Sequence, residues 1–138
     1  ETDPFKAASM LGTWVFRNIE KKFTPLMSNA LDTLKSRRGD CGEHAALFVA
    51  LCRAAGIPAR EVAGLAYTDE QGEPVLGGHA WAEVYAGGRW IAVDPTFGQK
   101  IADAVHVKFA EGGMNESDGL IRMANVMGKL KVEVVSSE

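Results

Sequence analysis

The chain has 138 residues, of which 46% are hydrophobic and 24% charged, and its formal net charge is −3 at pH 7. This composition is typical of a folded globular protein and argues against a disordered chain. The charge balance gives no sign of nucleic acid or of an anionic membrane surface as a partner. We expect a single domain that spans residues 1–138, with enough chain to bury a core.

The sequence does not decide what flanks this domain in the full-length protein or where the protein is located. The chain starts at Glu1 rather than Met, which indicates a processed or excised piece of a longer protein. No apolar run approaches the roughly 18 residues of a membrane-spanning helix, and no signal peptide is present. We therefore expect no membrane insertion. The localisation is not predicted, and export to the periplasm stays open, because a secretion signal could have stood upstream of Glu1. The oligomeric state is not predicted either.

Two helices are predicted before residue 36. Asp3 is a suitable N-cap and Pro4 a suitable first helical residue, and apolar residues then recur at roughly helical spacing. We expect this helix to span residues 4–22. After a break, Ser28 is a suitable cap for a short second helix, Asn29–Lys35.

A third helix begins within the stretch Arg38–Phe48. Asp40 can accept hydrogen bonds from the free N–H groups of the first helical turn, and Glu43 stands at the position of a capping-box partner. The alanine-rich, apolar run that follows predicts a buried helix. Gly56 and Pro58 would end it.

The pattern then changes to strands. We expect strands at residues 59–67, 79–85, 89–94, 105–110 and 129–135, a loop at 69–74, a hairpin turn at Gly87-Gly88 and a helix within 116–127. Helices followed by mostly adjacent antiparallel strands indicate the α+β class.

The two cysteines are predicted to differ in role. Cys41 and Cys52 are 11 residues apart, which on one helix is roughly 16 Å and too far for a disulfide. Cys52 lies within the apolar run and is interpreted as a core residue. Cys41 lies at the helix start, where the partial positive charge favours the reactive thiolate.

A cysteine nucleophile needs a base, and the base needs a group that orients it. His79 follows two glycines at the start of a predicted strand, which leaves room for a substrate. Asp94 ends the partner strand. A hairpin turn at 87–88 places residue 79 near 96 and residue 81 near 94, so Asp94 can lie beside His79.

Three short boxes carry a resemblance to a known family: Gly39-Asp40-Cys41-Gly42-Glu43, Gly78-His79-Ala80-Trp81 and Val93-Asp94-Pro95-Thr96. They resemble the transglutaminase-like superfamily, a branch of the papain-like cysteine enzymes, in sequence and in the order Cys, His, Asp. The resemblance covers roughly residues 26–107. It implies Cys41 as nucleophile, His79 as general base and acid, and Asp94 as the orienting acid. It also implies an α+β, papain-like fold with N-terminal helices, in which the cysteine helix packs on an antiparallel sheet.

A catalytic cysteine also needs donors for the oxyanion. The backbone N–H of Cys41 is one natural donor, because it lies at a helix N-terminus. Animal transglutaminases use an upstream tryptophan as the second donor. Here Asn29 is the candidate for that place, and an ordinary position in the first turn of a helix is the competing interpretation. Trp14 is more simply explained as core packing.

Two further histidines remain. His44 lies three residues after Cys41 and could contact the thiol or, with Cys41, provide half of a metal site, whereas His106, on a predicted strand, is interpreted as structural. The second pair of ligands that a structural zinc site needs is missing, so no metal is predicted. The acidic loop 69–73 lacks EF-hand spacing, which argues against calcium. No cofactor is predicted.

These features together predict a bacterial-type, transglutaminase-like cysteine hydrolase that acts on peptide or carboxamide bonds of a protein or peptide substrate through a thioester. Capture of the same acyl-enzyme by a lysine amine, which would make the protein a transglutaminase, stays open. A catalytically silent module that binds peptides is the third possibility.

Overall fold

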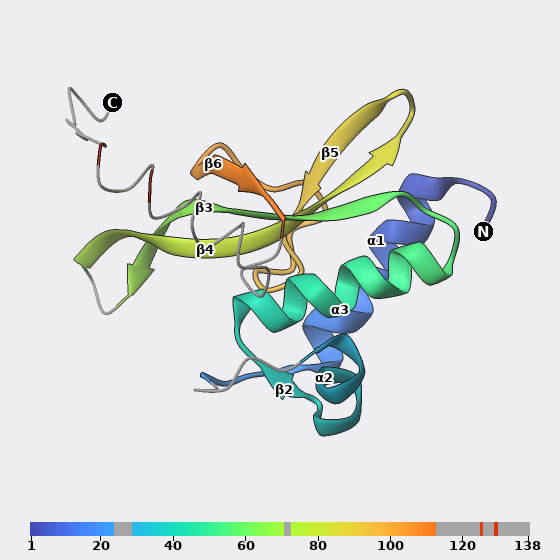
Figure 1. Ribbon diagram of the computed structural model, residues 1–138, viewed down its shortest axis with the longest axis horizontal. Helices are drawn as coiled ribbons and strands as arrows, with labels where there is room; N and C mark the ends of the chain where they lie inside the picture. The colour runs from blue at the N-terminus through green and yellow to red at the C-terminus, as the bar shows by residue number, and fades with distance from the viewer. Residues whose placement is uncertain (24–28, 71–72, 113–124, 126–128, 130–138) are drawn as a thin grey trace.

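The computed structural model describes residues 1–23, 29–70, 73–112, 125 and 129, and its architecture is α+β (Figure 1). The helices in these residues are α1 (Pro4–Asn18), α2 (Ala30–Ser36) and α3 (Cys41–Ala54). The strands are β1 (Glu20–Lys21), β2 (Arg38–Gly39), β3 (Ala59–Glu70), β4 (Glu73–Ala86), β5 (Arg89–Val93) and β6 (His106–Glu111). The predicted helix within 116–127 and the final strand at 129–135 lie almost wholly outside the described residues.

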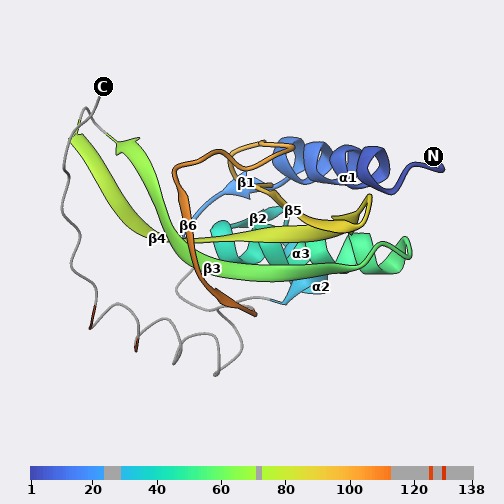
Figure 2. The same ribbon diagram turned by 90° about the horizontal axis from the view of Figure 1, so that it is seen from above.

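The four longer strands form one antiparallel sheet in the order β5-β4-β3-β6. The helices lie on one side of this sheet, and from above α3 runs beneath β3 and β4 (Figure 2). The core forms between these layers. Its buried side chains include Val15 of α1, Phe48 and Cys52 of α3, and Val84 and Val93 of the sheet. The predicted packing of the cysteine helix on an antiparallel sheet is therefore confirmed.

The outer face of the sheet carries charged side chains. Glu83 accepts from Arg60 at 2.6 Å and from Lys108 at 2.9 Å, and the guanidinium of Arg60 lies 4.0 Å from the ring centre of Trp90. Such a network suits a face that meets water rather than the core. No helix in the described part of the chain is long and apolar enough to cross a membrane.

The hairpin that positions the predicted site has the expected register. Gly87 and Gly88 both have positive φ, 61° and 80°, as a tight turn between two strands requires. Ala82 pairs with Val93 and Val84 with Ile91, and continuing this register places residue 79 opposite 96. The prediction from the sequence is confirmed here.

Three predictions need correction. The first helix ends at Asn18 and not near residue 22, because the chain becomes extended at Ile19 and β1 then pairs in parallel with β2. The second helix is capped by Asn29, whose side chain accepts from the N–H of Asp32; the predicted cap Ser28 is outside the described residues. The predicted loop at 69–74 is shorter, because β3 and β4 continue pairing as far as Glu70 and Glu73.

Candidate active site

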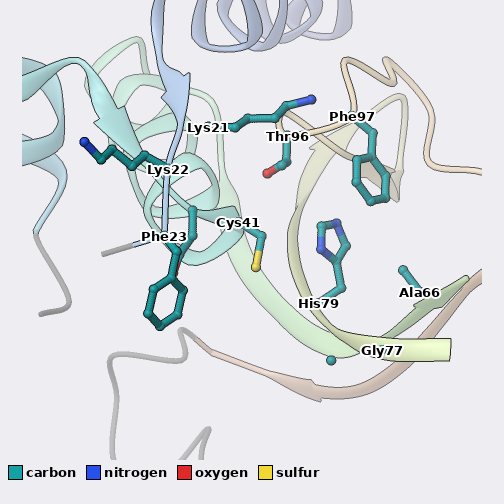
Figure 3. A pocket seen from close by; sticks show the side chains of 11 residues that line it. Lys21, Lys22, Phe23, Cys41, Ala66, Gly77, His79, Thr96 and Phe97 are labelled. Carbon is teal, nitrogen blue, oxygen red and sulfur yellow. The ribbon is translucent and has the colours of Figure 1, made fainter. Parts of the chain in front are cut away.

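A cavity of about 470 Å³ opens where the start of α3 meets the sheet (Figure 3). Cys41 and His79 line it, with their side chains turned toward one another. The walls include Thr96 and Phe97 from the segment after β5, and Lys21, Lys22 and Phe23 from the segment after α1. Parts of the chain that are distant in sequence thus share one cavity.

The local structure around Cys41 is that of a well-capped helix. The Asp40 side chain accepts from the N–H groups of Gly42 and Glu43, at 3.1 and 3.4 Å. The Glu43 carboxylate in turn accepts from the N–H of Asp40 at 2.9 Å, so the predicted capping box is confirmed. This arrangement fixes Cys41 as the first residue of α3, with its backbone N–H directed out of the helix end.

The two thiols are in different environments. Cys52 is fully buried, and burial raises the pKa of its thiol to about 12, which makes it a core residue. Cys41 is only partly buried and faces the cavity. The different roles predicted for the two cysteines therefore match their placement.

His79 is held on three sides. Its Nε2 lies 2.7 Å from Oδ2 of Asp94, its ring stacks on Phe97 with centroids 4.5 Å apart, and the ring faces Cys41 in the cavity. Burial by itself lowers the pKa of His79. The hydrogen bonds and charges of Asp94 and Cys41 outweigh burial and raise this pKa to about 9. The site therefore favours a protonated imidazole beside the thiol.

Asp94 is fully buried, yet its carboxylate is supplied with four donors. Oδ1 accepts from the N–H groups of Thr96 and Phe97, each at 3.0 Å, and Oδ2 accepts from His79 and from His106, each at 2.7 Å. Burial by itself raises the pKa of this carboxyl. The bonds to the two histidines and to Phe97 outweigh it and hold the pKa below its usual range. Asp94 is therefore ionised at neutral pH.

His106 is part of this site, although the sequence offered only a structural interpretation for it. Its Nε2 lies 2.7 Å from Asp94 and its Nδ1 lies 2.8 Å from Oδ1 of Asp103. His106 is the first residue of β6, which pairs with β3 at the sheet edge opposite β5, and its side chain contacts Asp94, the residue that follows β5. No local pattern in the sequence reports such a long-range pairing.

The other sequence candidates lie elsewhere. Asn29 does not line the cavity, and its side chain caps α2 by accepting from the N–H of Asp32 at 2.9 Å. This matches the competing structural interpretation. His44 is fully buried, and its ring nitrogens face the carbonyl oxygens of Asp40 and Ile19 rather than the cavity. His44 thus ties the end of α1 to the start of α3.

One group of the described residues has a donor set suited to a metal. The ligand atoms of His79, Asp94 and His106 lie within 4.8 Å of one another, and two imidazoles with one carboxylate are ligands that divalent transition metals accept. The same atoms are already joined by two hydrogen bonds of 2.7 Å. A metal would have to replace both of them.

Comparison with known proteins places these features in a family. The model of the transglutaminase-like superfamily matches residues 1–95. The human kyphoscoliosis peptidase is 35% identical over 82 residues, which are 56% of this chain and 12% of that protein. The chicken peptide-N(4)-(N-acetyl-β-glucosaminyl)asparagine amidase is 40% identical over 73 residues, which are 51% of this chain and 10% of that protein.

A solved structure agrees with the sequence comparisons. A "putative cysteine protease" from Cytophaga hutchinsonii superposes with a TM-score of 0.67 at 34% identity, over 78% of this chain and 36% of that one. The chain therefore spans well under half of the length of each of these three relatives.

Proposed function

Because the chain belongs to the transglutaminase-like superfamily, we propose that it is a cysteine hydrolase that cleaves peptide or carboxamide bonds through a thioester on Cys41. One observation carries the proposal. Cys41 and His79 face each other across one cavity, and Asp94 holds the far nitrogen of the His79 ring at 2.7 Å. Nucleophile, base and orienting group are the three parts that such chemistry needs.

The reaction would start from the thiolate of Cys41 and the imidazolium of His79. The sulfur attacks the substrate carbonyl, and the backbone N–H of Cys41 donates to the oxyanion that forms. The C–N bond then breaks, and His79 gives its proton to the leaving amine. A water molecule, deprotonated by His79, attacks the thioester; this releases the carboxylic acid and restores the ion pair.

Asp94 has a defined part in these steps. Its bond to Nε2 directs the other ring nitrogen toward the sulfur, and its buried charge stabilises the imidazolium while the proton is held. Phe97 and Trp81 stack beside the ring, with centroids 4.5 and 6.1 Å from it, and limit the access of water to the pair. An ion pair in such surroundings is stronger than one in bulk water.

The names of the relatives support hydrolysis and a protein or peptide substrate. One is called a peptidase and one an amidase, and the structural neighbour is described as a protease. Transfer of the acyl group to a lysine amine would use the same thioester. It is separated from hydrolysis by supplying a glutamine peptide with a fluorescent primary amine. Release of ammonia without incorporation of the amine identifies a hydrolase.

The ion pair is tested by alkylating Cys41 with iodoacetamide between pH 5 and pH 9, in a Cys52→Ala background. We expect the parent to react at pH 6 at least about tenfold faster than the His79→Ala variant, because only the parent has an imidazolium beside the sulfur that could stabilise the reactive thiolate. Equal, slow rates in both proteins would contradict the proposal and favour a silent, peptide-binding module.

A further inference from the structure

His106 is placed where its charge state matters to His79. Its side chain is 3% exposed, and it shares the Oδ2 atom of Asp94 with His79, each at 2.7 Å. The ring centres of the two histidines are 5.8 Å apart. A group this close to the orienting acid affects the proposed reaction even without touching a substrate.

The contacts of His106 determine how many protons it carries. Nε2 faces the carboxylate of Asp94 and Nδ1 faces the carboxylate of Asp103. Both carboxyls have a lowered pKa despite the opposing effect of desolvation. In Asp94 it is lowered mainly by the bond and charge of His79, and in Asp103 first by the bond from Gln99 and then by that of His106. An ionised carboxylate only accepts hydrogen bonds, so both nitrogens must donate. The imidazolium is the form that satisfies both contacts.

The groups around His106 leave its charge directed mainly at Asp94. Among the residues that the structure describes, the charged groups that face it are Asp94, Asp103 and His79, and the rings of Trp81 and Phe97 lie 5.1 and 6.0 Å from its own. Lys108, two residues further along β6, binds Glu83 and Glu111 instead. The cation therefore acts mainly on Asp94 and, through it, on His79.

From this geometry we propose that His106 is a positioning residue that fixes the Asp94 carboxylate and, as a second cation on its Oδ2, limits how firmly His79 holds its proton. The inference rests on the proposed function. His79 must first hold a proton and then release it to the leaving amine, and an imidazolium that is paired too strongly is a poor acid. Sharing one oxygen between two imidazolium ions weakens each pairing and eases that release.

The proposal predicts the direction of a shift. In His106→Gln the amide can still donate to Asp94, but the charge is gone. We expect the titration midpoint of His79 to move upward from about 9, because a like charge has been removed. A purely structural role predicts no change, or a fall if Asp94 becomes disordered. The midpoint is read from the NMR signals of ¹³C-labelled histidine side chains.

The matched control is Lys108→Gln. It removes the same charge from the same strand, but its ammonium binds Glu83 and Glu111 and not Asp94. His79 should then titrate as in the parent. An equal upward movement in both variants would overturn the proposal, because it would report the net charge of the protein rather than the shared oxygen.

Two further measurements complete the test. In the unaltered protein at pH 7, the ¹⁵N shifts of His106 should be those of an imidazolium, and a neutral ring would overturn the proposal whether or not the variant folds. Both titrations are repeated with EDTA. A His79 midpoint that a chelator changes would assign the cluster to a bound metal instead and overturn it too.

These readouts need no turnover, so they stay valid if no amide substrate is found. Where hydrolysis is measurable, His106→Gln should lower kcat several-fold and leave KM within about twofold, because the change acts on proton release and not on substrate binding. An unchanged kcat would contradict the proposed benefit to proton release.

Discussion

At the scale of single residues, Asp94 is the most constrained group of the site. A fully buried carboxylate is costly to ionise unless donors replace the water it has lost. Asp94 has four such donors, two from the backbone and two from histidines. The backbone pair comes from the two positions after Pro95, so the turn that ends β5 also fixes the acid. One carboxylate thus joins the hairpin to β6.

Asp94→Asn tests this constraint. The amide keeps the shape of the side chain but loses the charge that stabilises the imidazolium of His79. We expect the rate of Cys41 alkylation at pH 6 to fall by about tenfold, and by no more than in His79→Ala, because Asp94 acts through His79. Asp32→Asn, which removes an exposed carboxylate on α2, is the control and should leave the rate unchanged. A near-normal rate in Asp94→Asn would show that His79 needs no carboxylate.

His79 also makes the stability of the protein depend on pH. Its pKa is about 9 in the folded protein against 6.5 ordinarily. Because the pKa is raised on folding, the protonation of His79 stabilises the folded protein. This contribution to the free energy of unfolding is complete below pH 6.5 and is lost as the pH rises through about 9. Its size is about 3 kcal/mol, from a difference of about 2.5 pKa units. In urea unfolding, the stability difference between the parent and His79→Gln should therefore shrink by about this amount between pH 6 and pH 10. A difference that is constant with pH would contradict the raised pKa.

At the scale of elements, the approach of β6 to β3 depends on one glycine. The register between the two strands shifts at Ala63/Gly64, and a Cβ on Gly64 would collide with the backbone carbonyl of Val107 and with the ring of Trp81. His106 is the residue before Val107, so this close approach helps to place its side chain in contact with Asp94. A backbone collision cannot be relieved by a change of rotamer.

Gly64→Ala should therefore act on β6. We expect a loss of about 1–3 kcal/mol in the free energy of unfolding, because the strand must move or the ring must be displaced. In the same variant, the His106 signals should lose the shifts that come from Asp94. Gly77→Ala is the matched control, since a Cβ there meets nothing within 4 Å. Its stability should change by no more than about 0.5 kcal/mol.

The elements also show what the sequence could predict. The hairpin register followed from Gly87-Gly88 and strand alternation, which are local, and it brought His79 and Asp94 together as expected. The capping box and the placement of Cys41 were local too. The pairing of β1 with β2, and of β6 with β3, joins distant segments, so it could not be read from neighbouring residues. His106 was missed for that reason, and Asn29 was nominated by its position in the chain alone.

At the scale of the whole molecule, the site lies between two layers. Cys41 belongs to the helical layer, whereas His79 and Asp94 belong to the sheet and its edge. Phe48 is fully buried in the core shared by α1, α3 and the sheet, where its ring lies beside Gly12. The distance between thiol and imidazole is therefore set by the packing of the core.

Phe48→Ala tests this dependence. The loss of a buried aromatic ring should lower the free energy of unfolding by about 3–5 kcal/mol. Below its unfolding temperature the variant should also be alkylated more slowly at Cys41, because the helices and the sheet would pack at a different distance from each other. Met10→Ala, at a position of α1 that is 65% exposed, should do neither. If Phe48→Ala is destabilised but reacts at the parent rate, the site does not depend on how the layers pack.

The division of the reactive pair between two layers has a consequence for newly made chains. A chain that has formed α3 but has not yet docked the sheet carries an ordinary thiol, with no imidazole beside it. Under the proposed mechanism, such a chain cannot attack its neighbours or itself. Docking of the layers therefore delays the reactivity of Cys41 until the fold is complete. The time at which a fast-reacting thiol appears would report the rate of this last folding step.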